Sequence, residues 1–253
     1  MKTKFLFPVL FFSVMNVSAQ KFYATVEAGY AFKASGSRIA GEVDFFTFKN
    51  VKGSLGAGFV PTIRGGYILH PNIGFEVGVS YFSGSQVELG PYQDPSGFPY
   101  SFRFQGKTIR VMPSFNFTAL SRFSPLATIG FIIGAGTEAN VESNFSGQSI
   151  KSEFFDGNAL GWYVSLGAQY KWKNNRLLFI KADMIYQKFF PEKEIRYDYN
   201  TATGNNNYGL IFSFDPDKDD SHWFSFNSIG FSAGVKFLLG TKKKDTPQPA
   251  EVK

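Results

Sequence analysis

The stretch Thr128–Glu138 reads TIGFIIGAGTE, and it decides the fold class. Its odd-numbered positions, from Ile129 to Thr137, are mostly apolar, whereas its even-numbered positions are mostly small and end in the carboxylate of Glu138. A period of two residues indicates a β-strand with two different faces. The second face of a sandwich strand is polar and wet, but here it is rich in glycine. We therefore interpret the stretch as a strand whose bulky side chains face lipid and whose small side chains face a tight interior.

The composition favours an all-β protein. The 253 residues include 31 Phe, 12 Tyr, 3 Trp and 26 Gly, and this abundance of aromatic residues and glycine is typical of barrels rather than helical bundles. The formal charge is +6, or +4 without Lys2 and Lys4 of the leader described next, which is too mild to indicate a nucleic-acid partner. The absence of cysteine excludes disulfides, thiol chemistry and most zinc sites.

The first residues have the parts of a secretory signal peptide. Met1–Ala19 joins two lysines to an apolar run and ends in the small residues Val17-Ser18-Ala19, so the mature chain is expected to begin at Gln20. The alternative is an N-terminal membrane anchor, for which the apolar run is short, since a spanning helix needs ~20 residues. We expect one barrel domain over residues 20–240, followed by a flexible basic periplasmic tail over residues 241–253.

The same alternation recurs along the chain and predicts eight strands, joined alternately by short turns and long connections. The predicted strands are Phe22–Phe32, Leu55–Leu69, Ile73–Phe82, Thr108–Phe117, Thr128–Glu138, Ala159–Trp172, Leu178–Gln187 and Trp223–Leu239. The long connections are Lys33–Ser54, Ser83–Gln105, Glu142–Asn158 and Phe190–Ser221. Short turns at one end and long loops at the other are typical of an up-and-down transmembrane β-barrel. In this assignment Leu55 and Ala57 face outward, and a β-bulge near Gly106 reconciles the parity of Phe102 and Phe104 with that of the strand that follows.

The outward faces are apolar over almost every strand. A soluble lipocalin-like barrel or a β-sandwich, which is the alternative, would have polar outward faces. Outward aromatic residues near the strand ends fit two interfacial girdles, with Tyr81, Trp162 and Trp223 at one rim and Tyr67, Phe117, Trp172 and Phe237 at the other.

This layout resembles the OmpA/OmpX-like group of small eight-stranded outer-membrane barrels. The resemblance covers nearly all of Phe22–Leu239 and is carried by the leader, by the opening strand Phe22–Phe32 and by the closing strand Ile229–Leu239. It implies short periplasmic turns, long extracellular loops and a place in the bacterial outer membrane. It also implies contact with lipid, with lipopolysaccharide and with the barrel assembly machinery. Members often end in an aromatic residue, whereas Gly240–Lys253 follows the last strand here.

Strand parity predicts that eight charged side chains face the interior, and their signs balance. They are Glu27, Arg64, Glu76, Arg110, Glu138, Lys181, Asp183 and Lys236. An eight-stranded barrel is narrow enough to be filled by its own side chains, and buried charges must pair. We expect a salt-bridge network that plugs the lumen. The alternative is a narrow ion or small-solute channel gated by the same charges.

No catalytic, cofactor or metal site is expected, although four motifs invite a functional interpretation. Gly134-Ala135-Gly136 lies within a strand without a following helix, so it is no nucleotide loop. His70 lies in a turn with no nucleophile nearby in sequence. Ser221-His222 at the outer rim invites comparison with barrel enzymes that modify lipid A, but no matching acid is evident. Asp215–Asp220 alternates acids as Ca²⁺ ligands do, without the EF-hand glycine.

The fourth connection offers a surface for recognition. Ile195, Tyr197 and Tyr199 alternate, and Tyr208 to Phe214 alternate again after a turn. This pattern predicts a hairpin above the membrane with an unpaired edge, which could bind an extracellular protein partner through residues 190–221 by strand addition. The sequence therefore predicts an outer-membrane barrel with a structural or surface-recognition role that is not an enzyme.

Overall fold

The computed structural model describes residues 22–34, 39–40, 42–43, 46–47, 53–93, 99–118, 121–145, 148–173, 175–200, 205–206, 210–213 and 222–239. The predicted leader and the predicted tail lie outside these residues. No helix in the described part of the chain is long and apolar enough to cross a membrane.

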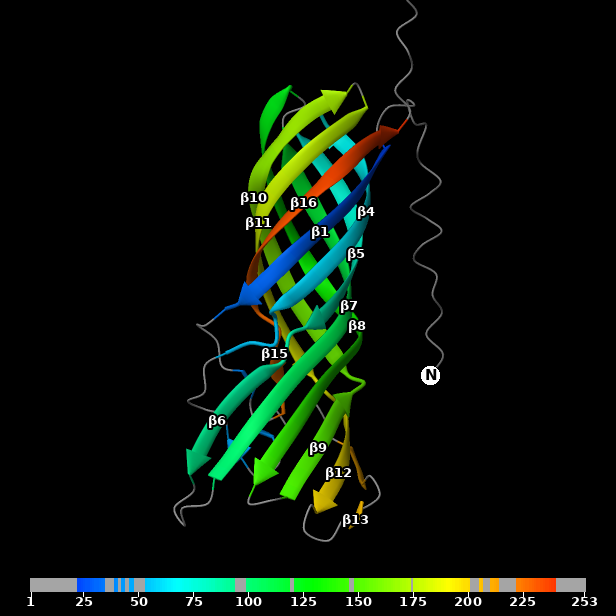
Figure 1. The fold of residues 1–253 in the computed structure, drawn as a ribbon. Helices are drawn as coiled ribbons and strands as arrows, with labels where there is room; N and C mark the ends of the chain where they lie inside the picture. The colour runs from blue at the N-terminus through cyan, green and yellow to red at the C-terminus, as the bar shows by residue number, and fades with distance from the viewer. Residues whose placement is uncertain are drawn as a thin grey trace, which may run out of the picture.

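The core of the structure is a closed antiparallel barrel of eight strands, as predicted (Figure 1). The barrel strands are β1 (Phe22–Lys33), β4 (Gly58–His70), β5 (Ile73–Gly84), β7 (Pro99–Thr118), β8 (Phe123–Phe145), β10 (Asn158–Lys173), β11 (Arg176–Phe190) and β16 (Ser228–Leu239). Each pairs with its neighbours in chain order, and the ring closes because β1 pairs with β16 from Phe22–Leu239 to Lys33–Ser228. Tight turns such as His70–Ile73 lie at one end, called here the short-turn end.

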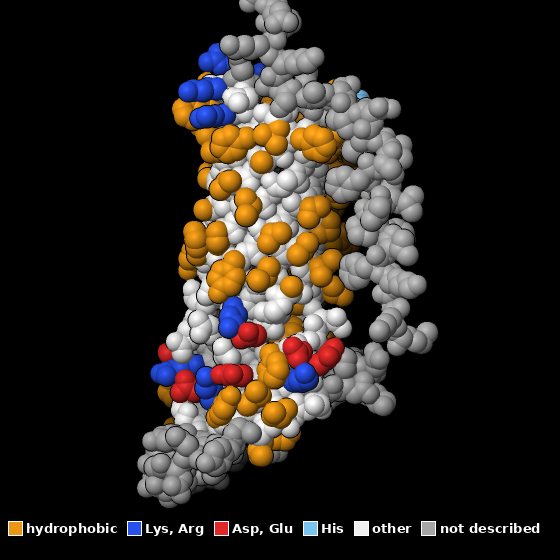
Figure 2. Space-filling view, turned by 90° about the vertical axis from the view of Figure 1, so that its right-hand side faces the viewer, with side chains coloured by type: hydrophobic (Ala, Val, Ile, Leu, Met, Phe, Trp, Pro, Cys, Tyr) orange, Lys and Arg blue, Asp and Glu red, His pale blue; other side chains and the backbone are white. Residues whose placement is uncertain are grey.

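The outer surface of the barrel is an apolar belt. Val26, Ile63 and Phe131 are 55%, 63% and 71% exposed, and Figure 2 shows hydrophobic side chains spread over this face. Aromatic pairs border the belt, with Phe22 and Tyr67 near the short-turn end. In hydrocarbon every backbone polar group needs an internal partner, and a closed barrel satisfies this requirement. The apolar belt on a closed barrel is the surface of a transmembrane barrel of the outer-membrane type.

Beyond the belt, the strands continue into an open sheet, called here the extension sheet. Barrel strands β7 and β8 run on into it, and Figure 1 shows it projecting from the end of the barrel opposite the short turns. Its other strands are β6 (Val87–Gln93), β9 (Gln148–Phe155), β12 (Lys193–Asn200), β13 (Asn205–Asn206) and β14 (Leu210–Ser213). Three segments predicted as long loops are therefore largely strand in their described parts. The short strands β2 (Glu42–Val43) and β3 (Phe46–Thr47) form a separate pair.

Several strands reverse their inward and outward faces where the belt ends. In β8, two residues, Gly136 and Thr137, lie opposite one residue of β7, and Gly136 has a φ of 55°. This is a β-bulge with glycine in the left-handed region. The neighbouring strands break at the same level, at Asp156-Gly157 between β9 and β10 and at residues 191–192 between β11 and β12. The faces change there because the barrel surface ends and the extension sheet begins.

The bulge predicted near Gly106 is wrong. Buried and exposed residues alternate without a break along β7, so Phe102, Phe104 and Gly106 face inward together with Thr108 and Arg110. The inward side chains of β7 change in type instead, from polar at the level of the belt to apolar in the extension sheet. The interruption that the sequence pattern implied lies on β8 instead.

An apolar cluster fills the end of the lumen next to the extension sheet. We call it the phenylalanine cluster, and its six fully buried rings are Phe82, Phe104, Phe154, Phe189, Phe224 and Phe226. Two segments turn inward to build it, namely residues 53–57 before β4 and strand β15 (Phe224–Ser225). β15 hydrogen-bonds through the amide of Ser225 to the carbonyl of Ile39 at 2.9 Å, and the amide of Leu55 donates to the carbonyl of Ser225 at 2.7 Å.

The predicted outward orientation of Leu55 and Ala57 is therefore wrong. These side chains are 0% and 7% exposed, and β4 begins only at Gly58. The segment that precedes β4 packs over the lumen, so its apolar residues face the phenylalanine cluster rather than lipid.

Candidate functional site

The barrel interior at the level of the belt is lined by polar side chains. Strand alternation places Glu27, Glu76, Arg64, Lys181 and Lys236 inward, each between 2% and 6% exposed. They come from β1, β5, β4, β11 and β16, which surround one lumen. Asp183 on β11 is half-buried and faces the same space.

Arg64 is the centre of the interior network. Its guanidinium lies 2.9 Å from Glu27 Oε1 and 3.5 Å from Glu76 Oε1. Its Nη1 also donates to the Tyr163 hydroxyl at 2.6 Å, and the hydroxyl of Tyr23 donates to Glu76 Oε2 at 3.0 Å. Charge-assisted bonds of this kind are stronger than neutral ones. The Arg64 side chain thus joins four strands across the lumen, because its partners lie on β1, β5 and β10.

Lys181 extends the network along the wall. Its Nζ lies 2.9 Å from Glu27 Oε2 and 3.7 Å from Asp183 Oδ1. Asp183 also accepts hydrogen bonds from Ser165 and Ser232 on the neighbouring strands. Lys236 places its Nζ 4.5 Å from the centre of the Tyr23 ring, which is a cation–π distance.

Glu138 is not part of the interior, which corrects its predicted place. The bulge at Gly136 reverses the parity of β8, so Thr137 is buried and Glu138 faces outward. Its Oε2 lies 2.8 Å from Lys107 Nζ, and the two side chains are 40% and 46% exposed. Figure 2 shows a zone of charged side chains where the belt ends.

Arg110 lies in the interior but outside the salt-bridge network. It is fully buried, its Nε donates to Gln187 Oε1 at 2.8 Å, and its Cζ lies 4.4 Å from the centre of the Phe82 ring. No carboxylate of the described residues pairs with it. The side chain therefore marks the boundary between the polar interior and the phenylalanine cluster.

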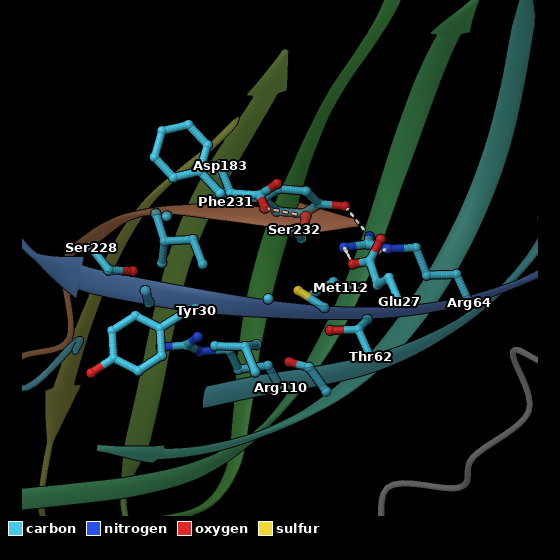
Figure 3. Close-up of a pocket in the computed structure, with 17 residues that line it drawn as sticks. Glu27, Tyr30, Thr62, Arg64, Arg110, Met112, Asp183, Ser228, Phe231 and Ser232 are labelled. Atoms are coloured by element: carbon cyan, nitrogen blue, oxygen red, sulfur yellow. Dashed lines mark hydrogen bonds and ion pairs between the residues drawn. The ribbon is translucent and has the colours of Figure 1, made fainter. Parts of the chain in front are cut away.

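Small cavities lie on both sides of the network among the described residues. The first has a volume of about 40 Å³ and lies between the network and Arg110 (Figure 3). The second, of about 10 Å³, is lined by Glu76, Lys181 and Lys236 on the other side. Glu27 and Arg64 line both cavities. In Figure 3 the Arg110 guanidinium points away from the Glu27–Arg64 pair.

Three uncharged interior residues that bind the charged side chains were missed at the sequence level. Tyr23 and Tyr163 supply hydroxyls to Glu76 and Arg64, and Gln187 holds Arg110. Their inward parity could be read from the alternation of their strands. A buried hydroxyl or amide needs a hydrogen-bond partner. The inward position of these residues therefore indicated that the interior charges also bind uncharged side chains.

The other motifs considered from the sequence gain no site. Gly134 and Gly136 flank the bulge of β8, and exposed His70 lies at the end of β4. His222 is described and half-buried, whereas Ser221 and the Asp215–Asp220 cluster lie outside the described residues. No group of three or more potential metal-ligating side chains occurs in the described ranges.

The edge of the extension sheet forms a second candidate region. β14 pairs with β12, from Lys193–Ser213 to Arg196–Leu210, as the predicted hairpin requires. β12 is not an edge, because its other side pairs with β9. A hydrogen bond of 2.7 Å from Lys193 to Asp156 ties this hairpin to the turn before β10 and raises the pKa of Lys193.

Comparison with known proteins finds similar solved structures and no matching family. No protein-family model and no curated protein matches the chain. The structure resembles Neisserial surface protein A at 18% identity over 86% of this chain and 97% of that one, with a TM-score of 0.36. It also resembles a major outer membrane protein from Thermus thermophilus at 14% identity over 88% and 100% of the chains, with a TM-score of 0.49.

A third neighbour is the outer membrane protein OprG from Pseudomonas aeruginosa, at 11% identity over 87% and 96% of the chains and a TM-score of 0.44. The second and third are outer membrane proteins by name. The predicted eight-stranded barrel fold is carried by the closed ring and the apolar belt described above.

Proposed function

We propose that this protein is a surface-recognition barrel of the bacterial outer membrane, closed to solute passage, which binds an extracellular protein partner through edge strand β14. The short-turn end lies in the periplasm, because β1 begins there and β16 ends there. The extension sheet then stands outside the cell. The single observation that carries the proposal is the exposure of three consecutive apolar residues on β14.

These residues present apolar surface on both faces of an edge. Leu210, Ile211 and Phe212 are 59%, 69% and 37% exposed, and they lie in the extension sheet beyond the apolar belt, because β14 pairs with β12. Native proteins usually blunt such edges with charge, proline or bulges. At the opposite edge, β6 carries an exposed proline, Pro91, which fits that rule. An unprotected apolar edge favours a partner that adds an extended strand and inserts alternate side chains.

Closure of the lumen at two levels supports a role outside the pore. The Arg64 network crosses the interior within the belt, and the phenylalanine cluster fills the lumen next to the extension sheet. A conducting pore would need a continuous wet path.

Attachment assays test the recognition role. The barrel is displayed on a non-adherent Gram-negative host, and attachment to immobilised collagen, laminin and fibronectin and to cultured epithelial cells is measured. We expect attachment by the wild type and its loss in Leu210→Lys and Ile211→Lys. Tyr92→Ser, which alters an exposed aromatic side chain on the opposite edge strand β6, is the matched control and keeps it. A wild type that attaches to nothing, or lysine variants that attach equally well, would refute the recognition role.

Planar-bilayer recordings separate this proposal from the alternative of a charge-gated channel. If the lumen is closed at two levels, wild type and Arg64→Ala both stay at background conductance, because the phenylalanine cluster is intact in both. A channel gated by interior charges would instead show steps that change in Arg64→Ala or Arg110→Ala.

A further inference from the structure

Arg110 has hydrogen-bond donors that the protein leaves without acceptors. Both terminal nitrogens of its guanidinium are buried and make no hydrogen bond with any described residue, while Nε alone is held by Gln187. Arginine stays protonated in proteins, so the charge cannot be removed by losing a proton. Burying a charge without a partner is strongly unfavourable. The site therefore needs a negative charge from somewhere else.

The charge count of the interior leads to the same requirement. With Glu138 outside, the described interior holds three carboxylates, Glu27, Glu76 and Asp183, against the four cations Arg64, Arg110, Lys181 and Lys236. One positive charge is therefore in excess. Neither Arg110 nor Lys236 forms an ion pair with a described residue, whereas Arg64 and Lys181 do. Lys236 shares the second cavity with Glu27 and Glu76, so we assign the excess charge to Arg110.

A cavity of suitable size lies beside this guanidinium. Its volume is about 40 Å³, and its lining includes Arg110, Ser80 and Ser228. The hydroxyl oxygens of both serines are buried and likewise make no hydrogen bond with described residues. A water molecule requires roughly 10–15 Å³ measured in this way, so the cavity has room for about three or four particles the size of a water molecule. Its donors come from the paired strands β5 and β7, where Ser80 lies directly across from Arg110, and from β16.

The two carboxylates that also line the cavity are already engaged. Glu27 pairs with Arg64 and Lys181, and Asp183 accepts hydrogen bonds from Ser165 and Ser232. The donors in this lining that lack acceptors are therefore those of Arg110, Ser80 and Ser228. We propose that the barrel encloses one small monovalent inorganic anion, chloride or a halide of similar size, bound by the guanidinium of Arg110 with help from the hydroxyls of Ser80 and Ser228.

The surroundings select the class of ion. One negative charge neutralises the excess positive charge of the interior, whereas a divalent anion would leave one negative charge in excess. A tetrahedral oxyanion has four water-sized oxygens, which is the upper limit of what the cavity holds, so a halide fits more readily. The phenylalanine cluster on one side and the Arg64 network on the other enclose the ion. The anion therefore enters while the barrel folds and neutralises the interior as a structural component, independently of any recognition by β14.

The test uses the folded chain in detergent micelles, refolded from urea in sodium chloride, in sodium bromide or in sodium gluconate at equal ionic strength. We expect a higher urea midpoint in either halide, saturating with concentration, because a ligand bound only by the folded state stabilises it. Arg110→Met should lose this halide dependence. Arg103→Met, which removes a half-exposed arginine of the same strand, should retain it. Equal midpoints in halide and gluconate, or a halide dependence that survives in Arg110→Met, would overturn the proposal.

A second measurement decides the matter if Arg110→Met does not fold. Crystals of the wild-type protein refolded in sodium bromide should show an anomalous peak within hydrogen-bonding distance of the Arg110 terminal nitrogens. Bromide found only on the protein surface, with water alone beside Arg110, would refute the site.

Discussion

Glu27 and Glu138 provide the sharpest test of the interior network. Strand parity alone predicts that both face inward, whereas the structure places only Glu27 there. Glu27 lies 2.9 Å from both Arg64 and Lys181, and its side chain is 4% exposed. Glu27→Gln removes the negative charge and keeps the shape, which leaves two buried cations with only their longer carboxylate contacts, of 3.5 and 3.7 Å. Removing one partner of a buried ion pair costs about 3–5 kcal/mol.

Glu138→Gln is the matched control. Its single ion pair with Lys107 is 40% to 46% exposed, and pairs of this kind contribute about 0–1 kcal/mol. We therefore expect the free energy of unfolding to fall at least about 2 kcal/mol further in Glu27→Gln than in Glu138→Gln.

The assay is urea unfolding in lipid vesicles, followed by the fluorescence of Trp162, Trp172 and Trp223, which lie on or near the barrel surface. The slope of free energy against urea should be the same for both variants, so that the midpoints report stability alone. Equal losses in the two variants, or a larger loss in Glu138→Gln, would refute the orientation of β8 and the central place of Glu27.

Two further comparisons test the faces of the barrel. A Cβ atom at Gly66 would lie 2.2 Å from the Tyr23 ring, whereas one at Gly65 would meet nothing within 4 Å. Gly66→Ala should therefore lower the free energy of unfolding by about 1–3 kcal/mol and Gly65→Ala should change it by less than about 0.5 kcal/mol, and similar urea midpoints would contradict this. Ile63 in the belt and Ile211 on β14 are 63% and 69% exposed. Ile63→Lys should lower the free energy of unfolding by about 2–4 kcal/mol if lipid covers that position, while Ile211→Lys should leave the urea midpoint unchanged. Equal effects of the two substitutions would contradict the placement of Ile63 in lipid and Ile211 in water.

The barrel could be predicted from the sequence because lipid imposes one rule on every strand. Apolar side chains such as Val26, Ile63 and Ile180 must face outward, so their period of two residues sets the face of each strand. The charges on unbroken strands follow from the same rule, and Arg64 and Lys181 lie inward for that reason. The rule holds only within the belt.

Beyond the belt the sequence pattern misleads, because inward residues become apolar too. Phe102 and Phe104 resembled lipid-facing residues and suggested a bulge, yet they pack inside with the phenylalanine cluster. The true reversals lie at Gly136 and at Asp156-Gly157, where positive φ angles let the strands turn their faces. Glycine is frequent throughout this chain, so these positions did not stand out by residue type.

Pairing partners depend on register, which parity does not contain. Arg110 was correctly placed on an inward face, but its cross-strand neighbours are Ser80 on β5 and Gly134 on β8, and neither carries a charge. The expectation of a balanced interior failed at this residue and at Glu138. The face on which a side chain lies can be predicted from its own strand. A salt bridge also depends on the register between two strands.

The inward-turning segments that close the lumen also constrain the order of assembly. Ser54 donates hydrogen bonds to the carbonyls of Ser225, at 3.3 Å, and of Asn227, across separations of 171 and 173 residues. Contacts between such distant parts of a chain close large loops and form slowly. Ser54 precedes the second barrel strand and Asn227 immediately precedes the last, so this contact joins the two ends of the barrel sequence. This contact therefore couples the closure of the ring between β1 and β16 to the packing of the phenylalanine cluster.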